Sequence, residues 1–341
     1  MAVTIKDIAK RLGVSTTTVS RALNDYEDIS PEMKSRVRDA AAEMGYIPNT
    51  LAQRLRKKQA DSLGLILPTH GPRFSDPFFS ELLAGIGNRA SRLGYDLLVS
   101  TYPPGEAESQ AYRQQVQSHR VDGFIIVRTR RRDARIDYLL EEGFPFVAFG
   151  RVEGENDFPY IDEDGEYGMQ RVFHHLAGLG HRRIACILSP SELNFTRIRL
   201  NGVRLGLEAH GIPLDESLLA TGDLTQRGGH RQAARLLSLA QPPTAIVAFN
   251  DLMAIGAMSA AQERGLVVGR DVSITGFDNI PMAEDSYPPL TTVNQPIYKI
   301  GSTLTSMLVS VIKEEALESK SVCLRPELVR RQSSGPAPKF M

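Results

Sequence analysis

The sequence lacks several features that would assign it to a broad class of protein. Its 341 residues carry 40 basic and 40 acidic side chains, so the net charge gives no sign of a nucleic-acid partner. Only Cys186 and Cys323 are present, far apart and without a CxxC pair, which argues against a disulfide framework or a structural zinc site and favours a reducing cytoplasm. Because no run of 18 apolar residues occurs and the charged N-terminus has no apolar core, we expect neither a membrane protein nor an exported one.

Motifs of common catalytic sites are also absent. The sequence contains no GxSxG, no GxxxxGK[ST], no HExxH and no cysteines at metal-ligand spacing. His174, His175 and His181 lie in and at the end of one predicted helix, where surface or capping roles are expected. We therefore predict that the protein is not an enzyme and uses no metal and no cofactor.

The basic residues gather at the N-terminus, where residues 1–60 hold eleven Lys and Arg against seven Asp and Glu. Thr4 is placed to cap a short amphipathic helix. After a tight turn, Ser15 is placed to cap a second helix, TTTVSRALN, and Ser30 a third. We expect a small all-α headpiece over residues 1–47, in which two helices are joined by a tight turn.

From Leu63 onward, short apolar runs such as LGLILP and VDGFIIV alternate with amphipathic stretches. This alternation predicts parallel βαβ units. The pattern starts again after Gly165, so we expect an α/β core of two doubly wound lobes. The predicted boundaries are a basic linker at 48–60, a core at 61–332 and a flexible tail at 333–341. Within the core, we expect an N-lobe at about 61–162 and 292–320 and a C-lobe at about 163–291 and 321–332.

Five motifs, in this order, resemble those of the LacI/GalR family of bacterial repressors. The first is TIKDIAKRLGVSTTTVSRALN with the segment that follows it. The others are RLNG at 199–202, FND at 249–251, GFDN at 276–279 and PPLTTVNQP at 288–296. The resemblance runs to about residue 330 and implies a helix-turn-helix headpiece, a hinge helix, and a core like that of a periplasmic binding protein with the ligand between its lobes.

The resemblance implies that the second headpiece helix lies in the major groove of operator DNA, where Thr16, Thr17 and Arg21 face base edges. In the family the hinge pushes a Leu side chain into the minor groove, and here that side chain is Leu55. The other expected DNA contacts, which orient the headpiece or bind phosphates, are Thr4, Ser15, Thr18, Ser20, Asn24, Asn49, Gln53 and Arg56.

The family motifs also imply a set of effector-binding residues in the core: Arg199, Asn250, Asp278 and Gln295. An arginine fork and a carboxylate suit the paired hydroxyls of a sugar. Phe79 matches an aromatic residue that stacks on the ligand in the family. Three neighbours of these positions are further candidates, Asp76, Phe78 and Phe195.

The segment VRTRRRDARIDYLLEEGFPFVAFGR has an unusual number of arginines. Arg128, Arg130 and Arg151 follow predicted strands and are expected at the edge of the cleft, and Asp162 lies where the chain crosses between the lobes. Family members that sense α-glucosides such as maltose or trehalose are similar in this stretch. The same arginines could instead form a solvated loop.

Together these features predict a cytoplasmic repressor that binds a pseudo-palindromic operator as a homodimer and is released by a small sugar, an α-glucoside. Three alternatives remain open. The same scaffold could use a corepressor such as a purine or a phosphoprotein, or the chain could be a sugar transport binding protein or an enzyme. The transport protein is opposed by the basic headpiece and the missing export signal. No heptad repeat follows Arg331, so no tail-mediated tetramer is expected.

Overall fold

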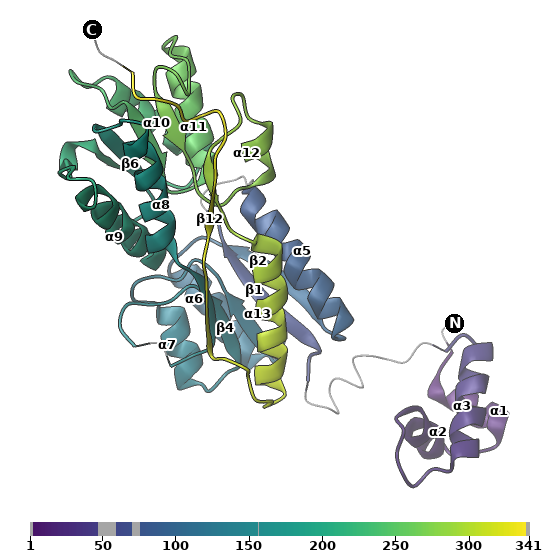
Figure 1. Cartoon of the computed structure of the whole chain (residues 1–341). Helices are drawn as coiled ribbons and strands as arrows, with labels where there is room; N and C mark the ends of the chain where they lie inside the picture. The colour runs from purple at the N-terminus through teal and green to yellow at the C-terminus, as the bar shows by residue number, and fades with distance from the viewer. Residues whose placement is uncertain (1–2, 47–58, 70–75, 156, 339–341) are drawn as a thin grey trace. The chain divides into compact units, whose positions relative to one another are not determined.

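The computed structural model describes residues 3–46, 59–69, 76–155 and 157–338. The chain divides into two compact units, Met1–Gln59 and Ala60–Met341, which are described separately (Figure 1). The hinge candidates Asn49, Gln53, Leu55 and Arg56 lie outside the described residues.

In its described residues, 3–46, the small unit is a headpiece of three helices, α1 (Ile5–Leu12), α2 (Thr16–Leu23) and α3 (Pro31–Glu43). The helix starts expected from the sequence are confirmed. Asp7 accepts hydrogen bonds from the backbone and the hydroxyl of Thr4 at 2.9 and 2.7 Å, and the Ser15 hydroxyl accepts one from the Thr18 N–H at 3.0 Å. The three helices bury a small apolar core that includes Ile8, Val19, Ala22 and Val37.

The N-lobe is built on a parallel six-stranded sheet in the order β11-β5-β4-β3-β1-β2. The strands are β1 (Ser62–Pro68), β2 (Asp96–Tyr102), β3 (Gly123–Ile126), β4 (Phe146–Phe149), β5 (Tyr160–Glu163) and β11 (Ser321–Leu324). Helices α5 (Pro77–Arg92) and α13 (Ile297–Ile312) pack on one face of the sheet, and α6 (Glu106–Gln117) and α7 (Ala134–Glu141) pack on the other. Both faces are therefore covered, as a parallel sheet requires.

The C-lobe repeats this plan around a parallel four-stranded sheet in the order β7-β6-β8-β9. Its strands are β6 (Ile184–Leu188), β7 (Leu219–Thr221), β8 (Ala245–Ala248) and β9 (Ser273–Thr275). Its helices are α8 (Gly165–Gly178), α9 (Asn194–Glu208), the short 3-10 helix η1 (Glu216–Leu218), α10 (Gln226–Leu237), α11 (Asp251–Glu263) and α12 (Pro281–Asp285). Two doubly wound lobes are thus confirmed.

In the part of the core that the structure describes, three crossings connect the lobes. The first follows β5, and the others are β10 (Thr292–Asn294) and β12 (Glu327–Val329), which pair antiparallel (Figure 1). The sequence predicts the C-lobe for residues 321–332, but β11 pairs with β5 and belongs to the N-lobe sheet. Strand pairing over this sequence distance leaves no local signal, which is why the boundary was misplaced.

The predicted flexible tail packs on the C-lobe through residue 337. Ser333 is fully buried, and its hydroxyl accepts from the Thr291 N–H at 2.8 Å and donates to the Ile274 carbonyl at 2.6 Å. The Ala337 N–H donates to the Leu179 carbonyl at 2.9 Å. A Pro/Gly/Ser-rich composition predicts looseness only where the backbone lacks partners, and here the edge of the C-lobe sheet supplies them. In the described part of the chain, no helix is long and apolar enough to cross a membrane.

Candidate functional site

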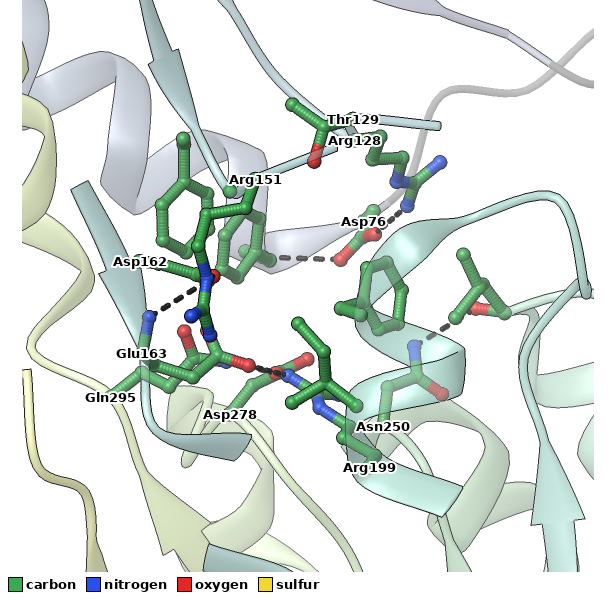
Figure 2. Close-up of a pocket in the computed structure, with 16 residues that line it drawn as sticks. Asp76, Arg128, Thr129, Arg151, Asp162, Glu163, Arg199, Asn250, Asp278 and Gln295 are labelled. Carbon is green, nitrogen blue, oxygen red and sulfur yellow. Dashed lines mark hydrogen bonds and ion pairs between the residues drawn. The ribbon is translucent and has the colours of Figure 1, made fainter. Parts of the chain in front are cut away.

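A pocket lies between the two lobes, where strands of both sheets end (Figure 2). It encloses about 620 Å³ of space that atoms do not fill, part of it open to solvent. Its lining residues are Asp76, Phe78, Arg128, Thr129, Phe149, Gly150, Arg151, Asp162, Glu163, Phe195, Ile198, Arg199, Leu224, Asn250, Asp278 and Gln295.

The structure brings together most of the effector residues predicted from the sequence, and only Phe79 and Arg130 do not line the pocket. Phe79 is fully buried in the N-lobe core, while its neighbour Phe78 lines the pocket and stacks on Phe149 with ring centroids 6.0 Å apart. Successive helical residues point about 100° apart, so one residue of the Phe pair faces the core and the other the pocket. The prediction for Phe79 is corrected accordingly.

Arg130 is also corrected. Its guanidinium lies 2.5 Å from the Glu108 carboxylate, which is fully buried on α6. The pairing holds Arg130 against the N-lobe rather than in the pocket.

Each of three pocket arginines is paired with a carboxylate (Figure 2). The pairs are Arg128–Asp76 at 2.7 Å, Arg151–Asp162 at 2.6 Å and Arg199–Glu163 at 2.5 Å. The fourth carboxylate, Asp278, lies 3.8 Å from Arg199 and accepts a hydrogen bond from the Gln295 amide at 2.7 Å. The pocket therefore carries one more acidic side chain than basic ones.

Burial shifts the pKa values of these acids. Desolvation raises the pKa of Asp278 well above its ordinary value, against the opposing effect of Arg199. Desolvation and the neighbouring Glu163 raise the pKa of Asp162 to about 6, opposed by Arg151. Desolvation also raises the pKa of Asp76, opposed by Arg128. These carboxyl groups can thus accept hydrogen bonds or, once protonated, donate them.

Arg199 is held on several sides at once. Its guanidinium donates to the Phe249 carbonyl and lies 3.5 Å from the ring centroid of Phe277 and 4.7 Å from that of Phe195. Among the described residues, Nε of Arg199 and Oε1 of Gln295 are buried without a hydrogen-bond partner. Buried polar atoms normally have partners, so a polar ligand is the natural one for these two.

Asn250 combines a structural role with its place in the pocket. Its carboxamide oxygen accepts from the Met253 N–H at 3.0 Å, which caps α11, and its NH2 group donates to the Leu224 carbonyl at 3.1 Å. Asp251, the next residue, is fully buried, and desolvation raises its pKa to about 7 against hydrogen bonds from the Thr292 hydroxyl and the Ile280 N–H. No group of three or more His, Cys, Asp or Glu side chains in the described chain could hold a metal ion.

Sequence reasoning missed several lining residues. Phe149 ends the β4 strand and Gly150 follows it, directly before the predicted Arg151, while Glu163 follows the predicted Asp162. The same signal, a position at the carboxyl end of a predicted strand, could have found them. Ile198 and Leu224 carry no comparable signal, because apolar residues on an amphipathic helix or in a loop are usually core.

On the headpiece, residues of α2 form a shallow hollow with Ile5 and Tyr26: Thr16, Thr17, Ser20 and Arg21. The Arg21 guanidinium lies 2.8 Å from the Asp28 carboxylate and 4.9 Å from the centroid of the Tyr26 ring. The side chains at the helix ends are engaged locally. Thr4 and Ser15 bond at helix starts, the Thr18 hydroxyl lies 2.9 Å from that of Ser15, and Asn24 donates to the Ser20 carbonyl at 2.6 Å.

Comparison with known proteins assigns both units. Residues 4–49 match the model "Bacterial regulatory proteins, lacI family", and residues 173–334 match "Periplasmic binding protein-like domain". The HTH-type transcriptional regulator AglR of Rhizobium meliloti (strain 1021) is 35% identical over 99% of this chain and 96% of its own. The HTH-type transcriptional repressor CytR of Escherichia coli (strain K12) is 33% identical over 99% of this chain and 98% of its own.

Solved structures give the same assignment. A lac repressor dimer bound to operator and the anti-inducer ONPF matches with a TM-score of 0.85 and 30% identity over 98% of this chain and all of that one. A complex of the transcriptional regulator CelR with cellobiose matches with a TM-score of 0.75 and 31% identity over 97% of this chain and 99% of that one. These relatives regulate transcription and are not enzymes, which confirms that prediction. The chain belongs to the LacI family of bacterial transcriptional regulators.

Proposed function

We propose that the protein is a repressor that binds a pseudo-palindromic operator as a homodimer and is released when a small sugar, an α-glucoside, occupies the pocket. The observation that carries this proposal is the pocket itself. Paired guanidinium and carboxylate groups offer donors and acceptors to sugar hydroxyls, and the rings of Phe78, Phe149 and Phe195 offer apolar faces to sugar C–H groups. Relatives solved with cellobiose and with ribose support a sugar as the ligand class.

The α-glucoside is the narrower part of the proposal. It depends on the arginine-rich segment, of which Arg128 and Arg151 line the pocket. Both are already oriented by carboxylates, and an oriented guanidinium gives up less side-chain freedom when it binds hydroxyls.

The DNA contacts are proposed from the headpiece. Thr16, Thr17 and Arg21 lie on one side of α2, as a recognition helix in the major groove requires. Leu55 is proposed as the wedge in the minor groove. The lac repressor dimer bound to operator, which this chain resembles, supports dimeric binding. We place this activity in the bacterial cytoplasm, at the nucleoid when the operator is bound.

A thermal-shift screen of the full chain tests the ligand class. Maltose, trehalose, cellobiose, ribose and hypoxanthine are compared, because a ligand present at 100 times its Kd stabilises the folded state by about 2.7 kcal/mol. We expect maltose or trehalose to raise the melting temperature most. If only hypoxanthine raises it, the sugar proposal is wrong and the purine alternative replaces it.

Gel shifts with an operator selected from random duplex DNA then test the direction of control. The stabilising sugar should weaken operator binding, with a coupling of about 1–3 kcal/mol between the two sites. A sugar that tightens binding would identify a corepressor instead.

The same assay tests the DNA contacts by substitution. Arg21→Ala should relax specificity at one base position at a cost of about 1–3 kcal/mol, while Arg36→Ala, an equal change of charge at an exposed site on α3, should leave specificity unchanged. Leu55→Ala should weaken specific binding far more than non-specific binding. Equal losses for both kinds of DNA would exclude the wedge.

A further inference from the structure

The arginine-rich loop after β3 also contacts the other lobe. The Arg131 N–H donates to the Glu192 carbonyl at 2.8 Å, and the Asn194 N–H donates to the Thr129 carbonyl at 3.0 Å. Between these two bonds, Arg130 and Leu193 form an isolated antiparallel bridge. Residues 129–131 of the N-lobe and 192–194 of the C-lobe are thus joined backbone to backbone at the start of α9. We call these two segments the interlobe latch.

The loop after β4 strengthens the latch. The Asn194 side chain donates to the Arg151 carbonyl at 2.8 Å, and the Glu153 N–H donates to the Arg131 carbonyl at 2.9 Å. The Glu153 carboxylate in turn accepts two hydrogen bonds from the Arg131 guanidinium, each at 3.1 Å. Because Thr129 of the latch lines the pocket, as does Arg151, whose carbonyl binds Asn194, the latch forms part of the pocket wall.

A buried ionic cluster lies behind the latch. The Arg135 side chain is fully buried and donates to Glu108 at 3.0 Å and to Asp133 at 2.8 and 2.7 Å. The side chains of Glu108 and Asp133 are fully buried as well. A buried cluster of this kind contributes little net stability compared with apolar side chains, because desolvation offsets the attraction of the charges. Its position therefore invites a role beyond stability.

The cluster hydrogen-bonds to the backbone of the loop after β3. Arg135 donates to the carbonyls of Val127 and Arg128 at 3.3 and 3.1 Å, and Asp133 accepts from the Arg130 N–H at 2.9 Å. Arg128 has a φ of +51°, a left-handed conformation that costs a non-glycine residue free energy and persists only where its surroundings enforce it. The hydrogen bond from Arg135 to the Arg128 carbonyl constrains the backbone at this residue.

We propose that Glu108, Asp133 and Arg135 are positioning residues that couple the pocket to lobe contact. By fixing the backbone of residues 127–130, they turn Arg128 toward the pocket and at the same time hold the latch in register with residues 192–194. Arg130 and Arg131 thus set the contact between the lobes rather than bind the effector. Only the identity of the ligand in this proposal rests on the proposed function.

Hydrogen exchange on the ligand-free full chain tests the proposal. In Glu108→Gln we expect the amides of Arg131 and Asn194 to exchange roughly tenfold faster, because removing a charged partner weakens the buried network. The β6 segment, residues 184–188, should exchange as in the wild type. The matched control is Glu106→Gln on the same helix, whose carboxylate pairs with Arg113 at 2.6 Å on the surface and should change neither amide.

The response of Asn194 is decisive, because it lies on the other lobe and does not bond Glu108. If only Arg131 responds, or if the control variant speeds both amides equally, the coupling is wrong. Should Glu108→Gln not fold, Arg130→Met removes one guanidinium from Glu108 and leaves its pair with Arg135. It should speed both amides in the same direction, and an unchanged Asn194 amide would again overturn the proposal.

Calorimetry with maltose separates this proposal from the sugar assignment. If maltose binds the wild type, we expect Glu108→Gln to raise the Kd for maltose roughly tenfold, because Arg128 is no longer held toward the pocket. An unchanged Kd would overturn the positioning role. If maltose does not bind the wild type, the α-glucoside assignment loses its support. The exchange result on Arg131 and Asn194 then decides the latch by itself.

Discussion

Replacing Arg199 by Met should destabilise the core through the acids that it leaves behind. The Arg199 side chain is 4% exposed and pairs with Glu163, whose side chain is 6% exposed. Methionine fills a similar volume and can still pack against the Phe277 ring, so the main loss is the positive charge. Glu163 then remains buried without its partner.

The expected cost is about 3–5 kcal/mol, the usual penalty for removing one member of a buried ion pair. For a core of this size each kcal/mol lowers Tm by about 2–4 °C, so Tm should fall by roughly 10 °C. Adding Glu163→Gln removes the stranded charge and should recover more than half of the loss. Because Arg199 opposes the raised pKa of Asp278, its removal lets Asp278 hold a proton more readily in the folded state, so the deficit should be smaller at pH 5 than at pH 8.

The assay is a double-mutant cycle on the full chain, in which urea unfolding at both pH values measures the free energy of unfolding of each variant. Arg113→Met is the control, since its pair with Glu106 is largely exposed and should contribute less than about 1 kcal/mol. If Arg199→Met costs no more than the control, or if Glu163→Gln adds its own loss instead of restoring stability, the pocket acids do not depend on this guanidinium.

Three further predictions concern stability. Because the pKa of Asp251 is raised to about 7, the folded chain retains a proton that the unfolded chain releases, so the free energy of unfolding should rise as pH falls through about 7 toward 4. Asp251→Asn should flatten this slope by about 1.4 kcal/mol per pH unit, measured by urea unfolding. Gly85→Ala should cost about 1–3 kcal/mol of stability, since the new Cβ would lie 2.2 Å from the Tyr298 carbonyl. Gly87→Ala, whose Cβ would meet nothing within 4 Å, should stabilise α5 by about 0.5–1 kcal/mol. Equal Tm values for the two variants would contradict this. Ser15→Ala removes the cap of α2 and should destabilise the headpiece by about 1 kcal/mol, seen as faster exchange of the α2 amides but not of the core.

The pocket could be predicted from the sequence as far as it depends on strand ends. Arg128, Arg151 and Asp278 follow apolar runs, and parallel strands bring their carboxyl ends to one edge, so these side chains meet in the cleft. Which side of a helix or loop faces the pocket cannot be predicted from strand ends. Phe78 and Phe79 have the same chemistry, and only the packing of α5 on the sheet decides which of them faces the pocket.

The fold shows the same division. Headpiece helices with caps at Thr4, Ser15 and Ser30 are local structures, and the sequence predicts their starts closely. The pairing of β11 with β5 and the burial of Ser333 join segments far apart in the chain, so neither leaves a local pattern. The position of Arg130 is likewise set by a distant contact, because its partner Glu108 lies on α6, 22 residues earlier in the chain.

The triple crossing between the lobes has a consequence for synthesis on the ribosome. The N-lobe begins at β1, but one face of its sheet is covered by α13 and one edge is closed by β11, which emerge from the ribosome last. Most of the C-lobe, by contrast, is one continuous stretch from α8 to α12. The second lobe to begin is therefore the first to complete its sheet, while β1 to β5 of the first lobe remain partly uncovered. This reverses the usual order in which N-terminal domains fold first and makes the nascent N-lobe the part of the core that most needs protection from aggregation.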